Sequence, residues 1–199
     1  MLERFTENFY LTGNSFNEFL GNATEDEKKR YQKYYDRSEK NFSPEDYKID
    51  LEHPINLLVV GTTWCWDSQT HIPILVRIAE HNTKINLRIF NKDQYPFLIS
   101  KINGGEKVPQ ILVLTQDFYY LDRWVERSTL AYQLVAELRK NIGWGEDKSK
   151  EFTKEFRKQF LKNQRKMEEA FIQEIRTLLT RTDAIQGTTT RLHETDQST

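Results

Sequence analysis

The stretch Ile55–Pro73 reads INLLVVGTTWCWDSQTHIP and is the most informative part of this chain. Its first residues, 55–60, are mostly apolar and have no helical period, which is typical of a buried strand. Residues 64–80 resume helical spacing, with Ile72 and Leu75 on one side of the predicted helix. The stretch therefore predicts a buried strand that passes through a short loop into a helix.

Similar patterns continue along the chain. Short apolar runs predict strands at 85–90, 111–114 and 118–125, and helical spacing predicts helices at 94–102 and 128–141. The element order is β-α-β-α-β-β-α. Strand-helix-strand units give parallel pairs and a tight loop gives an antiparallel pair. We therefore predict an α/β fold with a mixed sheet of about four strands and helices on both faces.

The α/β region, residues 51–145, is flanked by helical extensions. Residues 1–50 are predicted to form a helical N-terminal extension, in which Thr24 and Glu27 have the spacing of a capping box. Residues 146–182 are predicted to form a C-terminal helix. Residues 183–199 are rich in Thr, Gln and Asp, and they are predicted to be a disordered tail.

The C-terminal helix carries an apolar stripe at helical spacing that includes Phe152, Phe156, Phe160 and Phe171. We expect this stripe to pack back on the chain, with dimerisation through it as the alternative, so a monomer is favoured over a dimer. Eight basic residues fall within 148–166. They indicate a solvated face more than an anion-binding patch.

Composition limits the classes of function. The chain is 37% hydrophobic and 30% charged, so it can bury a core. Its net charge of −1 argues against a general attraction to nucleic acid or membranes. It has no apolar run of the ~20 residues that span a bilayer and no signal-peptide pattern. Cys65 is the single cysteine, which suits a reducing compartment. We expect a cytoplasmic protein without a nucleic-acid or membrane partner.

The strand-to-helix junction places Cys65 where open α/β sheets hold their sites. The first N–H groups of a helix have no intrahelical partner, and they favour a thiolate together with the helix dipole. The charge of Asp67 opposes this effect, so we expect a modestly activated thiol. The alternative is that Cys65 is a small buried apolar residue. His71 lies about 600° further round the helix and is expected to face away from the thiol. Four scattered histidines and one cysteine offer no metal-ligand spacing, and we expect no metal or cofactor.

The sequence Trp64-Cys65-x-x-Ser68 resembles the thioredoxin active-site motif Trp-Cys-x-x-Cys, with serine in place of the second cysteine. Pro73 stands where thioredoxins carry a proline in the active-site helix. Val108-Pro109 stands where they carry a cis-proline that faces the active cysteine. The resemblance covers roughly residues 50–142. It is strongest to a bacterial and archaeal group with a helical N-terminal extension and a Trp-Cys-Pro-Asp-Cys motif.

The resemblance implies thiol-disulfide exchange at Cys65, with protein disulfides or low-molecular-weight thiols as partners. It implies that Trp64 and Trp66 form an apolar lip, and that cis-Pro109 exposes the Val108 backbone for strand-like pairing with substrate. Ser68 cannot resolve a mixed disulfide as a second cysteine does. A further departure is Val59, where many thioredoxins keep a buried acid.

Two hypotheses follow from these features. The first is a monothiol oxidoreductase whose mixed disulfide is resolved by an external thiol. The second is a thioredoxin-fold binding or adaptor module that holds clients on the surface formed by Trp64, Trp66 and Pro109.

Overall fold

The computed structural model describes residues 4–101 and 106–195, and of residues 99–101 and 188–195 the backbone alone. The chain divides into two compact units. One unit is Met1–Glu126 together with Ile175–Thr199, and it contains the sheet. The other unit is Arg127–Glu174 and is helical.

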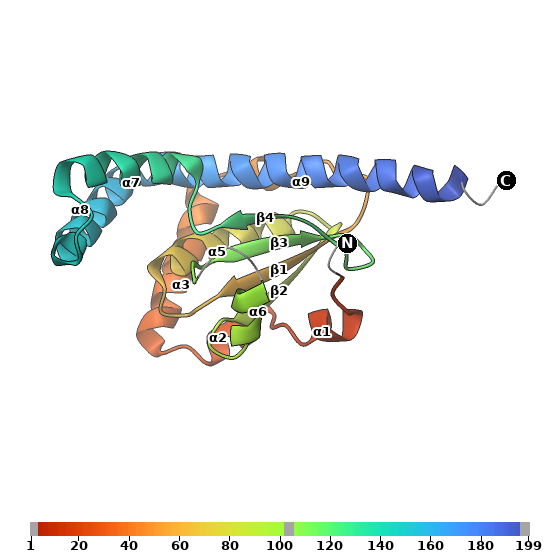
Figure 1. Ribbon diagram of the computed structural model, residues 1–199, viewed down its shortest axis with the longest axis horizontal. Helices are drawn as coiled ribbons and strands as arrows, with labels where there is room; N and C mark the ends of the chain where they lie inside the picture. The colour runs from red at the N-terminus through yellow and green to blue at the C-terminus, as the bar shows by residue number, and fades with distance from the viewer. Residues whose placement is uncertain (1–3, 102–105, 196–199) are drawn as a thin grey trace. The chain divides into compact units, whose positions relative to one another are not determined.

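The sheet has four strands in the order β2-β1-β3-β4 (Figure 1). Their bounds are β1 Ile55–Gly61, β2 Ile85–Asn91, β3 Gln110–Leu114 and β4 Tyr120–Val125. Strand β1 pairs with β2 in parallel, with Ile55 opposite Ile85. The β1–β3 and β3–β4 pairs are antiparallel. The predicted mixed sheet of about four strands is confirmed.

The second strand-helix-strand unit does not give the parallel relation that we expected. The unit consists of β2, α6 (Pro96–Lys101) and β3, and β3 pairs with β1 in the antiparallel direction. Because β2 is parallel to β1 and β3 is antiparallel to it, the chain enters β3 at the end of the sheet where it left β2, with Gln110 opposite Val60. The local pattern does not set this direction, since the connection over residues 92–109 is long enough to reach either end of the sheet.

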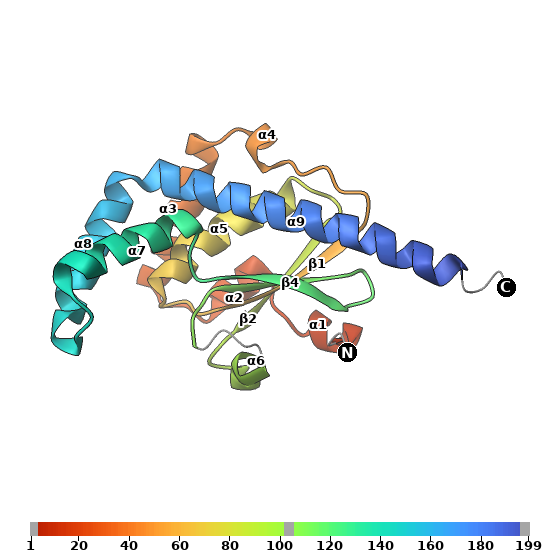
Figure 2. The ribbon, with the colours of Figure 1, turned by 45° about the horizontal axis from the view of Figure 1, so that its top comes forward.

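Helices flank both faces of the sheet, on opposite sides of it in Figure 2. On one face Leu58, Val60 and Leu112 pack with Tyr10 of α1 (Glu7–Leu11) and Leu98 of α6.

On the other face lies α5 (Trp66–Glu80), which packs close to the end of β1. A Cβ atom on Gly61 would lie 2.6 Å from Cδ1 of Ile72. A side chain at this position would therefore push the helix away from the strand.

The N-terminal extension is helical, as predicted. It contains α2 (Phe16–Gly21), α3 (Glu25–Asn41) and α4 (Pro44–Tyr47). Thr24 caps α3, and the capping box with Glu27 is confirmed, because each side chain bonds the other residue's backbone N–H. Helix α3 packs on α5, the helix that follows the cysteine.

The C-terminal region contains α7 (Thr129–Ile142), a short 3-10 helix (Glu146–Lys148), α8 (Ser149–Lys162) and α9 (Gln164–Thr195). We expected one helix after residue 146, and the structure has a break at Asn163. The Asn163 side chain donates to the carbonyl of Gln159 at 3.1 Å, which competes with the regular helical pattern.

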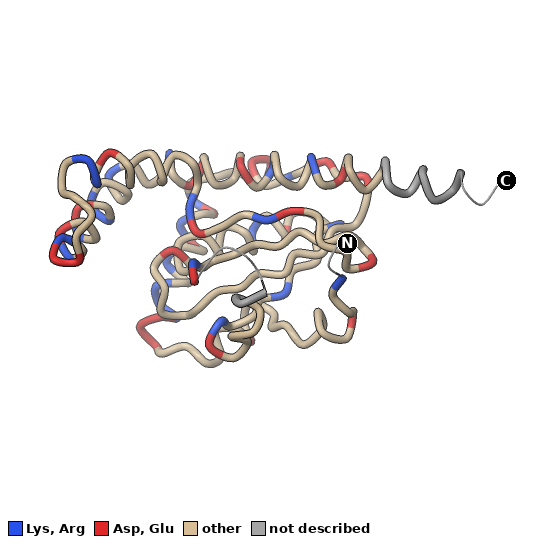
Figure 3. The backbone as a smooth tube through the Cα atoms, in the orientation of Figure 1, with Lys and Arg blue, Asp and Glu red and all other residues tan. Residues whose placement is uncertain are grey.

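The Phe stripe is buried, as predicted. Phe152, Phe156 and Phe160 stack along α8, and Arg139 of α7 lies 3.7 Å from the ring centroid of Phe152. Acidic and basic residues are both present along α8, and the basic ones are more numerous (Figure 3). One of their ion pairs joins Lys158 to Glu155 at 3.5 Å.

The prediction of a disordered tail from residue 183 is wrong for residues 183–195, which continue α9. The sequence there is polar, but side chains at the start of this segment form hydrogen bonds to the residues that precede β1. Asp183 accepts from the N–H groups of Glu52 and His53 at 2.9 and 2.8 Å, and Gln186 donates to the carbonyl of Pro54 at 3.4 Å. The polar composition of this segment therefore did not indicate that it forms a helix hydrogen-bonded to residues near β1. The last residues, 196–199, and the predicted turn at 103–105 lie outside the described residues.

Among the described helices, none combines the length and the apolar character that crossing a bilayer requires.

Candidate functional site

Cys65 is the N-cap residue of α5, as the strand-loop-helix pattern predicts. Its backbone is extended, with φ −71° and ψ 126°, and its carbonyl accepts the N–H of Gln69 at 3.0 Å. The side chain is partly exposed. The thiol therefore stands at the N-terminal end of the helix, where the helix dipole can stabilise a thiolate.

The Val108–Pro109 peptide bond is cis, as predicted. The thiol of Cys65 lies 3.6 Å from the carbonyl oxygen of Val108, at donor–acceptor distance for sulfur. Pro109 is buried, and its carbonyl accepts the N–H of Glu126 at 2.8 Å. The segment before β3 is thus held against the cysteine by contacts on both sides of the cis bond.

Ser68 lies one helical turn after Cys65 and is fully buried. Its hydroxyl accepts the backbone N–H of Thr62 at 3.4 Å. In the thioredoxin motif this position holds the second cysteine. Here it holds a serine whose hydroxyl is hydrogen-bonded to the loop before α5.

The two tryptophans of the motif differ in exposure. Trp64 is 58% exposed, and its indole N–H donates to the carboxylate of Asp93 at 3.1 Å. Asp93 follows β2, so the loop after the neighbouring strand orients this ring. Trp66 is the first residue of α5 and is partly buried. An exposed indole with a fixed orientation can serve as an apolar contact for a second molecule.

Two other expectations concern residues near the thiol. His71 is buried, with Nδ1 2.8 Å from the carbonyl oxygen of Asp67 and its ring against Trp124. It faces the core beside β4, as expected for a side chain that points away from the thiol. Val59 is fully buried in β1, so an aliphatic side chain fills this position of the strand before the cysteine.

Sequence reasoning missed two residues of the site, Thr62 and Tyr31. The hydroxyl of Thr62 accepts the backbone N–H of Cys65 at 3.2 Å, and its carbonyl accepts the phenol of Tyr31 at 3.0 Å. Tyr31 comes from α3, where the sequence shows it as one of three tyrosines, with Tyr34 and Tyr35, at helical spacing. Burial, followed by the charges of Cys65 and Glu27, raises the pKa of Tyr31 well above its usual value.

Among the side chains that the structure describes, no three His, Cys, Asp or Glu residues are gathered as a metal ion requires.

A mixed four-stranded sheet, a cysteine at the start of the helix after β1 and a cis-proline facing it together define a thioredoxin-like protein. A family model described as "Thioredoxin" matches residues 13–139. The chain belongs to the thioredoxin family.

Two solved structures are similar over most of the chain. The first is a Pseudomonas aeruginosa protein of unknown function, with 20% sequence identity and a TM-score of 0.66. The second is an HIV epitope scaffold, with 22% identity and a TM-score of 0.63. In each case the match covers 88% of this chain and 98% of the other. At this identity the likeness shows the fold alone. No curated protein matches the chain.

Proposed function

We propose that this protein carries out thiol-disulfide exchange through Cys65 as a monothiol. The Cys65 thiolate attacks one sulfur of a disulfide, a Cys65–S–S–R bond forms, and the other sulfur leaves as a thiolate. An external thiolate then attacks the R sulfur, which releases Cys65 and a new disulfide. Each step exchanges one thiolate and one disulfide for another pair, so no further oxidant or reductant is needed.

The observation that carries the proposal is the position of Cys65. It is partly exposed at the N-cap of α5, with Sγ 3.6 Å from the Val108 carbonyl beside cis-Pro109. A thiolate at the start of a helix is stabilised, and an exposed thiolate can reach and attack a substrate disulfide. In this scheme Trp64 and Trp66 form the apolar lip for the substrate. Val108 and Pro109, whose side chains are buried, contact the substrate through their backbone beside Cys65.

The external thiol is required because the chain has one cysteine. The hydroxyl of Ser68 does not attack a disulfide sulfur at a useful rate, so the mixed disulfide has no internal route of release. The partners proposed are therefore protein disulfides and low-molecular-weight thiols, which the cytoplasm supplies.

The alternative function is a non-catalytic adaptor, which the exposure of Trp64 favours. An indole that is 58% exposed and oriented by Asp93 is suited to holding a client without covalent chemistry.

The test is incubation of the full chain with oxidised glutathione, followed by intact-mass spectrometry. The proposal predicts one glutathione adduct per chain, which reduced glutathione then discharges. Cys65→Ser should form no adduct. A wild-type chain that stays unmodified while its thiol is reduced and the protein folded would favour the adaptor.

A further inference from the structure

A hydrogen-bonded path joins the N-terminal extension to the cysteine. The Tyr31 hydroxyl of α3 donates to the Thr62 carbonyl, and the Thr62 hydroxyl accepts the Cys65 N–H. The N–H of the same Thr62 donates to Ser68. The carbonyl, the hydroxyl and the N–H of Thr62 therefore each bond a different residue. Of these three residues, Tyr31 is the one that comes from the N-terminal extension.

The position of Tyr31 itself is determined by packing. Its side chain is fully buried, with edge contacts to the rings of Phe16 and Phe19 at centroid distances of 6.0 and 5.8 Å. Its phenol stays protonated because burial raises its pKa, with the charges of Cys65 and Glu27 adding to the effect. The hydroxyl is thus a permanent donor held at one place.

The loop depends on this donor because the Thr62 carbonyl is buried. A buried carbonyl that loses its donor must find water or another partner, which requires backbone movement. Movement of Thr62 displaces its hydroxyl from the Cys65 N–H, and with it the geometry of the thiol at the helix start.

We propose that Tyr31 is a positioning residue that holds the Thr62–Cys65 loop, and through it sets the reactivity of the Cys65 thiol. The proposal deepens the proposed function, since it assigns control of Cys65 to a helix of the N-terminal extension. Tyr31 acts through Thr62 and is not itself placed on the substrate.

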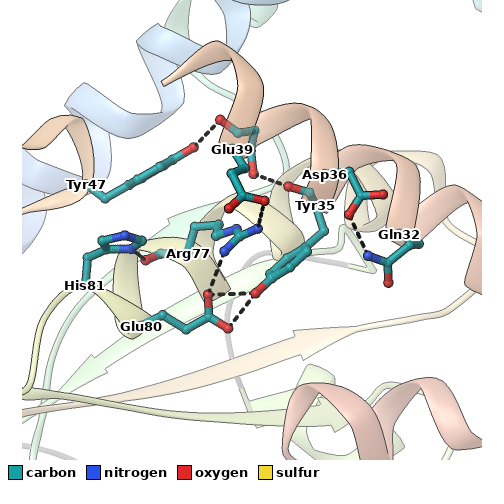
Figure 4. Close-up of polar contacts among 9 residues, drawn as sticks. Gln32, Tyr35, Asp36, Glu39, Tyr47, Arg77, Glu80 and His81 are labelled. Atoms are coloured by element: carbon teal, nitrogen blue, oxygen red, sulfur yellow. Dashed lines mark hydrogen bonds and ion pairs between the residues drawn. The ribbon is translucent and has the colours of Figure 1, made fainter. Parts of the chain in front are cut away.

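The test compares Tyr31→Phe with Tyr35→Phe, a matched control. Both variants remove one phenol oxygen from the same helix. The Tyr35 hydroxyl donates to Glu80, at the far end of α5 from Cys65 (Figure 4). The readout is the rate of Cys65 alkylation by iodoacetamide on the full chain across pH 5–10, with urea unfolding to record stability.

Tyr31→Phe should shift the alkylation profile to higher pH and lower the rate at pH 7 roughly three- to tenfold, the effect of about one hydrogen bond. Tyr35→Phe should leave the profile unchanged even if it lowers stability. An unchanged profile in Tyr31→Phe, or an equal shift in both variants, would overturn the proposal.

A second pair of variants covers the case in which Tyr31→Phe does not fold. Thr62→Val removes the acceptor for the Cys65 N–H and should give the same shift, whereas Thr62→Ser keeps the hydroxyl and should restore the wild-type profile. An unshifted alkylation profile in Thr62→Val would contradict the proposed hydrogen-bonded path from Tyr31 through Thr62 to Cys65.

The glutathione experiment separates this inference from the proposed function. If wild type forms no adduct but Tyr31→Phe still shifts alkylation, the exchange chemistry fails and the positioning role stands. If adducts form and alkylation is unchanged in Tyr31→Phe, only the positioning role fails.

Discussion

At the scale of single residues, the site depends on the difference between a sulfur and an oxygen atom. Cys65 has its thiol at the start of α5, and the buried Ser68 hydroxyl lies one turn further along. Both residues bond the same Thr62, whose hydroxyl accepts the backbone N–H of Cys65 and whose N–H donates to the hydroxyl of Ser68. The backbone therefore already arranges the two positions as a pair.

This arrangement makes a prediction for Ser68→Cys. A second thiol one turn away acts on a mixed disulfide at high effective concentration, as intramolecular groups do. The variant should gain dithiol-dependent reduction of insulin, measured by turbidity, whereas wild type should show little. The matched control Ser68→Ala should resemble wild type. If Ser68→Cys folds and gains nothing, the pocket does not support exchange between the two positions.

At the scale of elements, α3 is the helix that connects the N-terminal extension to the site. Arg77 of α5 lies 3.7 Å from the ring centroid of Tyr35 and pairs with Glu39 at 2.8 Å (Figure 4). Burial, followed by the hydrogen bond to Glu80, raises the pKa of Tyr35 to about 12, so this phenol also remains a donor at neutral pH. Helix α3 is thus fixed to both ends of α5, through Tyr31 at the loop and through Tyr35 near the far end.

The start of α3 offers a test of this element. Thr24→Ala removes the side-chain acceptor for the Glu27 N–H, and should lower the free energy of unfolding by about 1 kcal/mol. Urea unfolding measures the change, and Thr24→Ser, which keeps the acceptor, should retain most of the stability. Equal losses in the two variants would mean that the cap is not the cause.

At the scale of the whole molecule, the end of α9 returns to the unit that contains the sheet. Asp183 accepts two backbone N–H groups, from Glu52 and His53, and the His53 ring lies 2.9 Å from the same carboxylate. These residues directly precede β1, the strand that leads to Cys65. The chain thus secures the entry to its central strand with residues about 130 positions away.

Truncation tests this long-range contact. A chain that ends at Thr182 loses Asp183 and Gln186 with their hydrogen bonds, and should unfold at a clearly lower urea concentration than the full chain. A chain that ends at Gly187 keeps both residues and serves as the control. Identical unfolding midpoints for the two truncated chains would show that these bonds add no stability.

Asp183 should also make stability depend on pH. Burial alone raises the pKa of Asp183, but the hydrogen bonds from Glu52 and His53 outweigh it and lower the pKa below 3.8. Its contribution to stability is therefore full above the unfolded value, and it is lost as pH falls through the folded pKa. Asp183→Asn should be less stable by about 1.5–3 kcal/mol at pH 7, the range for hydrogen bonds to a charged group.

Urea unfolding of wild type and Asp183→Asn between pH 2 and 7 measures this effect. The difference between the two chains should shrink as pH falls from the unfolded value, about 4, through the lowered pKa of Asp183 in the folded protein. A difference that stays constant over this range would contradict the assignment.

The sequence by itself determined the four-stranded α/β fold, the N-cap position of Cys65 and the cis bond before Pro109. The strands and the start of the helix rest on local apolar runs and helical spacing, whereas the cis bond is implied by the resemblance to thioredoxins, which carry a proline at the matching position. The connection through α6 shows the limit, because residues 92–109 can lead to either end of the sheet, and the local pattern predicts the presence of β3 but not its direction.

Only the tertiary structure decided that Tyr31 bonds the loop before Cys65 and that the polar residues 183–187 are part of a docked helix. In both cases the partner lies far away in sequence, at Thr62 for Tyr31 and at Glu52, His53 and Pro54 for the end of α9. A tyrosine in an aromatic stripe and a polar run look the same in sequence whether or not a distant backbone group is present to bind them. A hydrogen bond requires a particular atom within about 3 Å, and no periodicity encodes that distance.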